Sequence, residues 1–166
     1  MTRDGQSSNT LYSNEDKSMM KLALQLAERG WKEHQEVPIG CVITHKGQVI
    51  AQSYNQKESL KMGTAHAEIL AIEEASKTLN GWRLNDCRLY VTAEPCAMCA
   101  GAIIQARVGT VIYGCDEPKF GCAKSLYPLL TEGKHNHQPQ VVGGLLAEEC
   151  SKVLQDFFLH RRQSKF

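Results

Sequence analysis

The chain has 166 residues, a length typical of one globular domain that can bury a sizeable core. Hydrophobic residues make up 42% and charged residues 22%, and no apolar run reaches the ~18 residues of a membrane span. The formal net charge of +1 indicates no partner by itself, so a nucleic-acid site requires a local cluster of basic residues.

The N-terminal segment is polar and lacks the apolar stretch of a secretory signal. We predict a disordered tail over residues 1–16 and a single domain over residues 17–166. The chain contains seven cysteines, an odd number, and no secretion signal precedes them. Reduced thiols in a cytoplasmic protein are therefore expected, rather than a disulfide framework.

The first part of the chain predicts a helix and then a hairpin. Apolar residues recur at helical spacing from Glu15 to His34, with Asn14 as the N-cap. Two short strands are expected over residues 41–44 and 49–54, joined by a turn at Lys46-Gly47. The following segment, up to Gly63, is polar and is expected to be a loop.

Helices and strands alternate in the rest of the chain. Helices are expected over residues 65–79, capped by Thr64, and from Pro95 to about residue 106. Strands are expected over 88–92 and 109–113, then turns over 115–139, a brief strand at 141–142 and a helix over 145–160. This order predicts the α/β class, with a mixed sheet and helices on both of its faces.

Two motifs at predicted helix starts have metal-ligand chemistry. Cys96 and Cys99 are spaced i, i+3, and a helix N-terminus favours the thiolate form that binds metal. A neutral His66 imidazole supplies a third ligand. Three protein ligands leave one tetrahedral position open for water, which is typical of a catalytic rather than a structural zinc site. We predict one Zn²⁺ per subunit, bound by His66, Cys96 and Cys99.

Glu68 lies two residues after the predicted ligand His66. A hydrolytic reaction at a zinc-bound water needs protons carried to the substrate and then to the departing group, and one carboxyl group beside the metal can do both. We therefore predict Glu68 as the catalytic proton shuttle. Taken singly, the Cys-x-x-Cys pair is also compatible with a redox site, a structural zinc site or coincidence.

The motifs resemble those of the zinc-dependent cytidine and deoxycytidylate deaminase superfamily. From about Ser18 to Gln163 the chain is similar to the bacterial tRNA-specific adenosine deaminases of the TadA type. The matching residues are Glu36-Val37-Pro38-Ile39-Gly40, Asn55, Thr64 to Ile69, Leu89 to Ala102, Asn136-His137, Asp156-Phe157-Phe158 and Arg161-Arg162.

The resemblance implies a three-layer α/β/α sandwich with a mixed five-stranded sheet. It implies hydrolytic deamination of adenosine to inosine at the wobble position of tRNA, by a homodimer that binds the anticodon stem-loop. The implied substrate-binding residues are Asn55, Val37, Ala67, Asn136, His137, Phe157, Arg161 and Arg162. Asn55 would hydrogen-bond the purine, Val37 and His66 would line the pocket, and Ala67 would lend its backbone.

Several of these residues also have ordinary structural interpretations. Phe157 and Phe158 continue the apolar face of the last helix, and basic residues at a helix C-terminus offset its dipole. Asn55 fits a turn, Asn136 and His137 fit a structural loop, and Glu36 fits a solvated charge.

Two further functions share the zinc motif. One is a free-base or nucleotide deaminase acting on guanine, cytosine or deoxycytidylate. The other is a catalytically silent zinc protein that binds RNA, although a silent site has no need of Glu68. Lys124 and Leu159 also depart from the family pattern, in positions that bear on RNA contact rather than on zinc.

Overall fold

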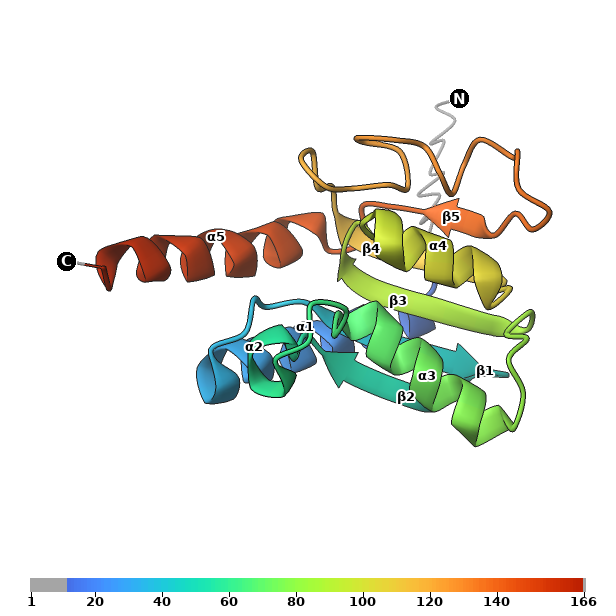
Figure 1. The fold of residues 1–166 in the computed structure, drawn as a ribbon, viewed down its shortest axis with the longest axis horizontal. Helices are drawn as coiled ribbons and strands as arrows, with labels where there is room; N and C mark the ends of the chain where they lie inside the picture. The colour runs from blue at the N-terminus through green and yellow to red at the C-terminus, as the bar shows by residue number, and fades with distance from the viewer. Residues whose placement is uncertain (1–11, 166) are drawn as a thin grey trace, which may run out of the picture.

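A five-stranded sheet forms the centre of the computed structural model, which describes residues 12–165 (Figure 1). The strand order is β2-β1-β3-β4-β5. The strands are β1 (Gly40–His45), β2 (Gln48–Tyr54), β3 (Cys87–Ala93), β4 (Thr110–Cys115) and β5 (Gln140–Val142). β1 is antiparallel to β2 and β3, whereas the β3–β4 and β4–β5 pairs are parallel. The predicted mixed sheet is thus confirmed.

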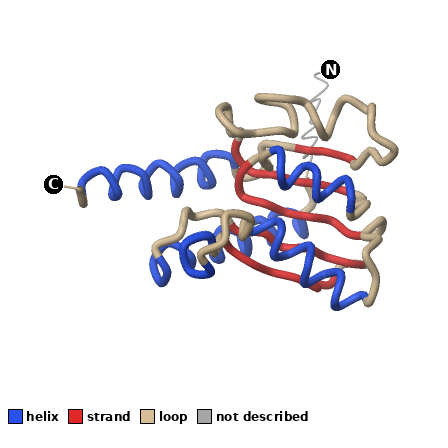
Figure 2. Tube along the Cα trace, in the orientation of Figure 1, coloured by secondary structure: helices blue, strands red, loops and turns tan. Residues whose placement is uncertain are grey.

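Helices cover both faces of the sheet, as Figure 2 shows. α3 (Ala67–Leu79) and α4 (Ala97–Gln105) pack on one face, and α1 (Asn14–His34) and the start of α5 (Ala147–Gln163) pack on the other. The C-terminal end of α5 projects beyond the sheet (Figure 1). Within the described residues, no helix is long and apolar enough to cross a membrane.

The start of α1 corrects two predictions. The N-cap is Ser13 rather than Asn14, because Ser13 and Asp16 form a reciprocal capping box. Asp16 is 6% exposed and accepts hydrogen bonds from the Tyr90 hydroxyl at 2.7 Å and from Arg88 at 3.0 Å. The predicted tail of residues 1–16 is therefore wrong from Ser13 onward, and its residues 1–11 lie outside the described part.

The predicted hairpin is confirmed. Lys46 and Gly47 connect β1 to β2, and both have positive φ (51° and 78°), which is typical of the tight turns that match strand twist. β1 starts at Gly40 against α1, where an added Cβ would lie 1.9 Å from the Ala23 carbonyl oxygen. Only glycine allows so close a helix–strand approach.

The helix starts near the motifs lie slightly later than predicted. α3 begins at Ala67 with His66 as N-cap, not after Thr64, and α4 begins at Ala97 with Cys96 as N-cap. A short helix, α2 (Lys57–Leu60), lies in the segment expected to be a loop. Helix α5 begins at Ala147, because Leu146 has positive φ, and continues to Gln163.

Candidate active site

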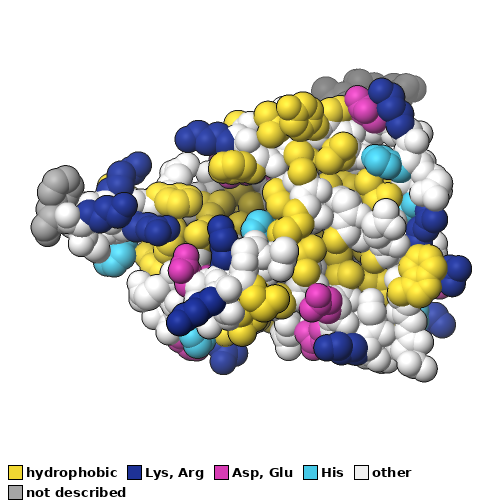
Figure 3. Space-filling view, viewed as in Figure 1, with side chains coloured by type: hydrophobic (Ala, Val, Ile, Leu, Met, Phe, Trp, Pro, Cys, Tyr) yellow, Lys and Arg dark blue, Asp and Glu magenta, His cyan; other side chains and the backbone are white. Residues whose placement is uncertain are grey.

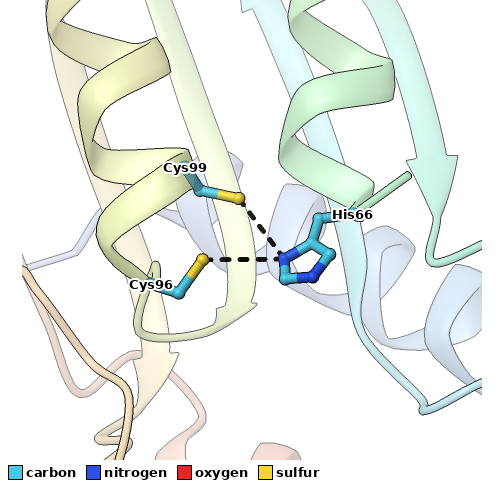
Figure 4. A group of neighbouring side chains, drawn as sticks. All are labelled: His66, Cys96 and Cys99. Atoms are coloured by element: carbon cyan, nitrogen blue, oxygen red, sulfur yellow. Dashed lines mark hydrogen bonds between the residues drawn. The ribbon is translucent and has the colours of Figure 1, made fainter. Parts of the chain in front are cut away.

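The three predicted metal ligands meet where α3 and α4 begin (Figure 4). The Nδ1 atom of His66 lies 3.6 Å from Sγ of Cys96 and 3.6 Å from Sγ of Cys99. All three ligand atoms lie within 4.8 Å of one another. His66 and Cys96 are the N-cap residues of α3 and α4, and Cys99 lies in the first turn of α4. These positions bring the three side chains together.

The spacing of these atoms fits a zinc ion. Ligands at ~2.0–2.1 Å (nitrogen) and ~2.3 Å (sulfur) around a tetrahedral centre are separated by about 3.6 Å, the Nδ1–Sγ distance found here. The thiol of Cys96 is also disposed to ionise, since hydrogen bonding from Cys99, and further from His66, lowers its pKa to about 4. A divalent metal takes the place of the proton that such a cluster shares.

Glu68 is buried beside this cluster, in the first turn of α3. Its side chain is 4% exposed, and burial raises the pKa of its carboxyl. Its own backbone N–H and the Cys99 thiol lower this pKa, but by less than burial raises it. No loop fixes the carboxylate, so it remains available for proton transfer next to the ligands.

A second buried carboxylate, Glu94, has the opposite surroundings. It accepts hydrogen bonds from the backbone N–H groups of Glu117, Ala123, Lys124 and Ser125 at 2.9–3.1 Å, and from the Ser125 hydroxyl. Burial alone raises the pKa of a carboxyl, but bonds from the Lys124 N–H and from Ser125 hold the pKa of Glu94 below its ordinary value.

Glu94 thereby fixes the loop that flanks the metal ligands. Gly121 in this loop forms a β-bridge with Cys96, and the Cys122 N–H bonds to the Pro95 carbonyl at 2.7 Å. A Cβ at Gly121 would lie 2.4 Å from the Glu94 carboxyl carbon. Lys124, which departs from the family pattern, keeps the loop through its backbone and pairs its side chain with Asp116 at 3.4 Å. Sequence reasoning assigned Glu94 no role.

Glu36 also fixes a connecting segment through hydrogen bonds. Its burial corrects the interpretation of Glu36 as a solvated charge. It is 1% exposed rather than solvated, and it accepts hydrogen bonds from the backbone of Glu58 and Ser59 and from the Ser59 hydroxyl. It therefore holds α2 in the connection between Asn55 and His66. In the sequence, the only mark of this role is that Glu36 directly precedes Val37-Pro38. That position is equally compatible with a solvated charge.

Asn55 lies directly beneath the start of α3. Its Oδ1 accepts a hydrogen bond from the Ala67 N–H at 2.8 Å, and the residue is 6% exposed. The Ala67 carbonyl accepts a bond from the Ser53 hydroxyl, so both backbone groups of Ala67 already have partners in the chain. The structure thus brings Asn55 and Ala67 to the metal site. Val37 is half-buried in the connection that leads into β1.

Asn136 and His137 lie at the other end of α4. The Nε2 atom of His137 is 2.7 Å from the Val108 carbonyl oxygen, and Asn136 Oδ1 accepts a bond from Arg107 at 3.2 Å. Helix α4, nine residues and about 14 Å long, runs from Cys96 towards these contacts, so they lie far from the metal ligands. Within this chain the two residues anchor a loop, and they do not join the metal site.

The aromatic pair on α5 is divided between core and surface. Phe157 is 4% exposed and packs edge-on against Trp31, with ring centroids 5.7 Å apart, so it offers little surface to a nucleic acid. Phe158 is 44% exposed. Arg161 and Arg162 are exposed, and the Arg161 guanidinium lies 5.9 Å from the centroid of the Phe157 ring.

Comparison with known proteins agrees with this geometry. The chain is 46% identical over 151 residues to a tRNA-specific adenosine deaminase of Bacillus subtilis, covering 91% of this chain and 93% of that protein. It matches a solved structure from work on A-to-I editing by tRNA:A34 deaminases, with 42% identity and a TM-score of 0.78 over 82% of this chain and 99% of that one.

A guanine deaminase structure from Bacillus subtilis is also similar, at 39% identity and a TM-score of 0.59, but it covers 63% of this chain and 66% of its own. Residues 13–115 match the family model described as the cytidine and deoxycytidylate deaminase zinc-binding region. That region contains the three metal ligands and Glu68. The chain therefore belongs to the zinc-dependent cytidine and deoxycytidylate deaminase family.

Proposed function

We propose that this protein converts adenosine to inosine at the wobble position of a tRNA anticodon, by hydrolytic deamination. The observation that carries the proposal is the extent of the similarity to tRNA-specific adenosine deaminases. It spans 91% of the chain, so it reaches well past residue 115, where the general deaminase region ends. Most of the C-terminal third is thus shared with proteins named for tRNA.

The chemistry follows from the buried residues at the start of α3. His66, Cys96 and Cys99 would hold a zinc ion, which would lower the pKa of a bound water towards ~7 and so make it a nucleophile. Water oxygen adds to C6 of the purine, the C6–N6 bond breaks, and ammonia leaves. Glu68 takes a proton from the water, delivers it to N1, and then carries a proton to the departing nitrogen.

The residues around Glu68 hold the base in place. The Oδ1 atom of Asn55 is occupied by the Ala67 N–H, which orients the side-chain amide and leaves its NH₂ group to donate to an acceptor nitrogen of the purine. His66 and Val37 line the pocket, and the backbone of Ala67 shapes its floor. A wobble adenosine is already partly unstacked, so its extrusion into such a pocket costs less than from a duplex.

The basic end of α5 serves the RNA backbone in this proposal. Arg161 and Arg162 contact the anticodon stem-loop, with Phe157 supporting them from beneath and Asn136 and His137 acting from a partner subunit. The protein is a cytoplasmic homodimer. Light scattering on the purified protein tests the dimer, for which a monomer at micromolar concentration would be the contrary result.

The experiment that tests the function measures inosine in an arginine tRNA anticodon stem-loop with adenosine at the wobble position. Free adenine, guanine, cytosine and deoxycytidylate are run in parallel, and Glu68→Ala is the control. We expect inosine in the stem-loop alone and its loss in the variant. If the protein deaminated guanine and left the stem-loop unedited, guanine would replace the wobble adenosine as the proposed substrate, and the proposed zinc mechanism would stand. Full activity of Glu68→Ala would remove the proposed proton shuttle.

A further inference from the structure

A groove of about 810 Å³ runs between the end of β4 and the projecting part of α5. One wall is residues 115–120, and the other is a face of α5 from Ser151 onward together with Lys165, just beyond the end of the helix. We call this the α5 groove. In Figure 3 the molecule is hollowed at the base of the projecting helix, and hydrophobic side chains line the hollow. The metal ligands and Glu68 do not line the α5 groove.

Two aromatic rings of the α5 groove are exposed. Phe120, in the loop wall, is 65% exposed, and Phe158, in the helix wall, is 44% exposed. Exposed apolar side chains that gather in one groove rimmed by charged residues are typical of a surface that a partner covers. Every nucleobase has a flat face that can stack on an aromatic side chain, which is how proteins bind single-stranded nucleic acids.

The charge of the α5 groove suits a polyanion. Four basic residues line it: Lys119, Arg161, Arg162 and Lys165. The helix wall carries no acidic side chain. Of the two acids in the loop wall, Asp116 is paired with the Lys124 ammonium at 3.4 Å, and Glu117 accepts the Lys119 backbone N–H at 3.2 Å. Lys and Arg side chains gather on the projecting end in Figure 3.

The groove adjoins the site of chemistry through its loop wall. Phe120 precedes Gly121, which forms the β-bridge with the metal ligand Cys96. Phe120 is therefore one residue, or ~3.8 Å between Cα atoms, from the residue that bridges to Cys96. Glu94 fixes the backbone on the far side of Gly121 through Ala123, Lys124 and Ser125. Phe120 is therefore an exposed ring on a constrained loop.

We propose that Phe120 stacks on the base of a single-stranded nucleotide next to the reacting adenosine, within the α5 groove. The basic residues of the groove contact the phosphates of the same segment. This inference rests on the proposed function and adds to it a residue that sets how the flanking nucleotide is held.

The test uses the full-length protein and an anticodon stem-loop with 2-aminopurine in place of the nucleotide on either side of the wobble adenosine. Stacking quenches 2-aminopurine fluorescence. Phe120→Leu keeps an apolar side chain without an aromatic face, and Phe120→Trp keeps the face. Trp82→Leu is the matched control, because Trp82 is a 51% exposed aromatic residue with the Arg83 guanidinium over its ring. Trp82 lies between α3 and β3, outside the groove.

We expect Phe120→Leu to weaken stem-loop binding about 5- to 150-fold and to abolish the quench at one flanking position. Phe120→Trp should restore both, and Trp82→Leu should change neither. If wild type and Phe120→Leu bound the stem-loop and quenched its fluorescence equally, the inference would be wrong. Inosine formation by the wild type in the same experiment would still support the proposed function. A wild-type protein that binds and quenches the stem-loop yet forms no inosine would overturn the proposed function instead.

Discussion

The metal centre and the outer end of α5 (residues 157–163) differ in how far their geometry is fixed before a substrate arrives. At the metal centre, Asn55, Glu68 and Glu94 are each at most 6% exposed, and backbone N–H groups of the chain hold Asn55 and Glu94 in place. On the outer end of α5, Phe158, Arg161 and Arg162 are exposed. Catalysis needs groups held in place in advance, whereas binding a flexible anion tolerates side chains that settle on contact.

The same contrast appears within the metal centre between Glu68 and Glu94. Both are buried, but Glu94 is surrounded by N–H and O–H donors and its pKa is lowered, whereas burial dominates at Glu68 and raises its pKa. A saturated carboxylate organises backbone, and an unsaturated one exchanges protons. The number of their donors thus fits the proposed division of roles, with Glu68 as the proton shuttle and Glu94 as a positioning residue.

Substitution of Glu68 is expected to have the largest effect on activity, and it distinguishes proton transfer from metal binding. Glu68→Gln should lower the rate of inosine formation by about 10²–10⁴-fold, because the amide cannot carry a proton. Zinc content should stay at one per chain, since Glu68 is not a ligand. Cys99→Ala should instead lose zinc and lower the melting temperature. Both properties are measured by metal analysis and thermal denaturation, and loss of zinc in Glu68→Gln would make Glu68 part of the metal site.

A smaller effect is expected at Glu94. Glu94→Gln should lower the free energy of unfolding at pH 7 by about 2–3 kcal/mol, because it removes charge-assisted hydrogen bonds. The folded pKa of Glu94 is depressed, so its contribution is present above the unfolded pKa of ~4.3 and is lost as pH falls through the folded value.

The difference in stability between wild type and Glu94→Gln should therefore shrink below pH ~4.3. Urea unfolding at several pH values measures it. Glu33→Gln is a matched control, since Glu33 is an exposed carboxylate on α1 paired only with its helix neighbours. A difference that stayed constant down to acid pH would contradict the ionised state assigned to Glu94.

The smallest effect is expected on α5. Arg162→Ala should weaken stem-loop binding several-fold and lower the slope of log K against log salt by about 0.7, the value for one phosphate contact on a single strand. Lys152→Ala serves as the control, because Lys152 lies on the same helix but pairs with Asp156 at 2.7 Å. Equal salt slopes for the two variants would remove Arg162 from the RNA contact.

Local patterns in the sequence determined much of this protein. The hairpin at Lys46-Gly47, the alternation of helices and strands, and the ligand set His66, Cys96 and Cys99 all follow from residues a few positions apart at turns and helix starts. Spacing and backbone preference act over that range, so the zinc site and its neighbour Glu68 were predicted before any contact was known.

Only the tertiary structure decided the rest. The parallel direction of β5, the burial of Asp16 against Tyr90, and the separation of buried Phe157 from exposed Phe158 depend on segments far apart in the chain. Glu36 and Glu94 read as ordinary charges until donors 22 to 31 residues away surround them. The buried carboxylates of Glu36 and Glu94 are tolerated because distant N–H groups converge on them, and no local pattern reports that convergence.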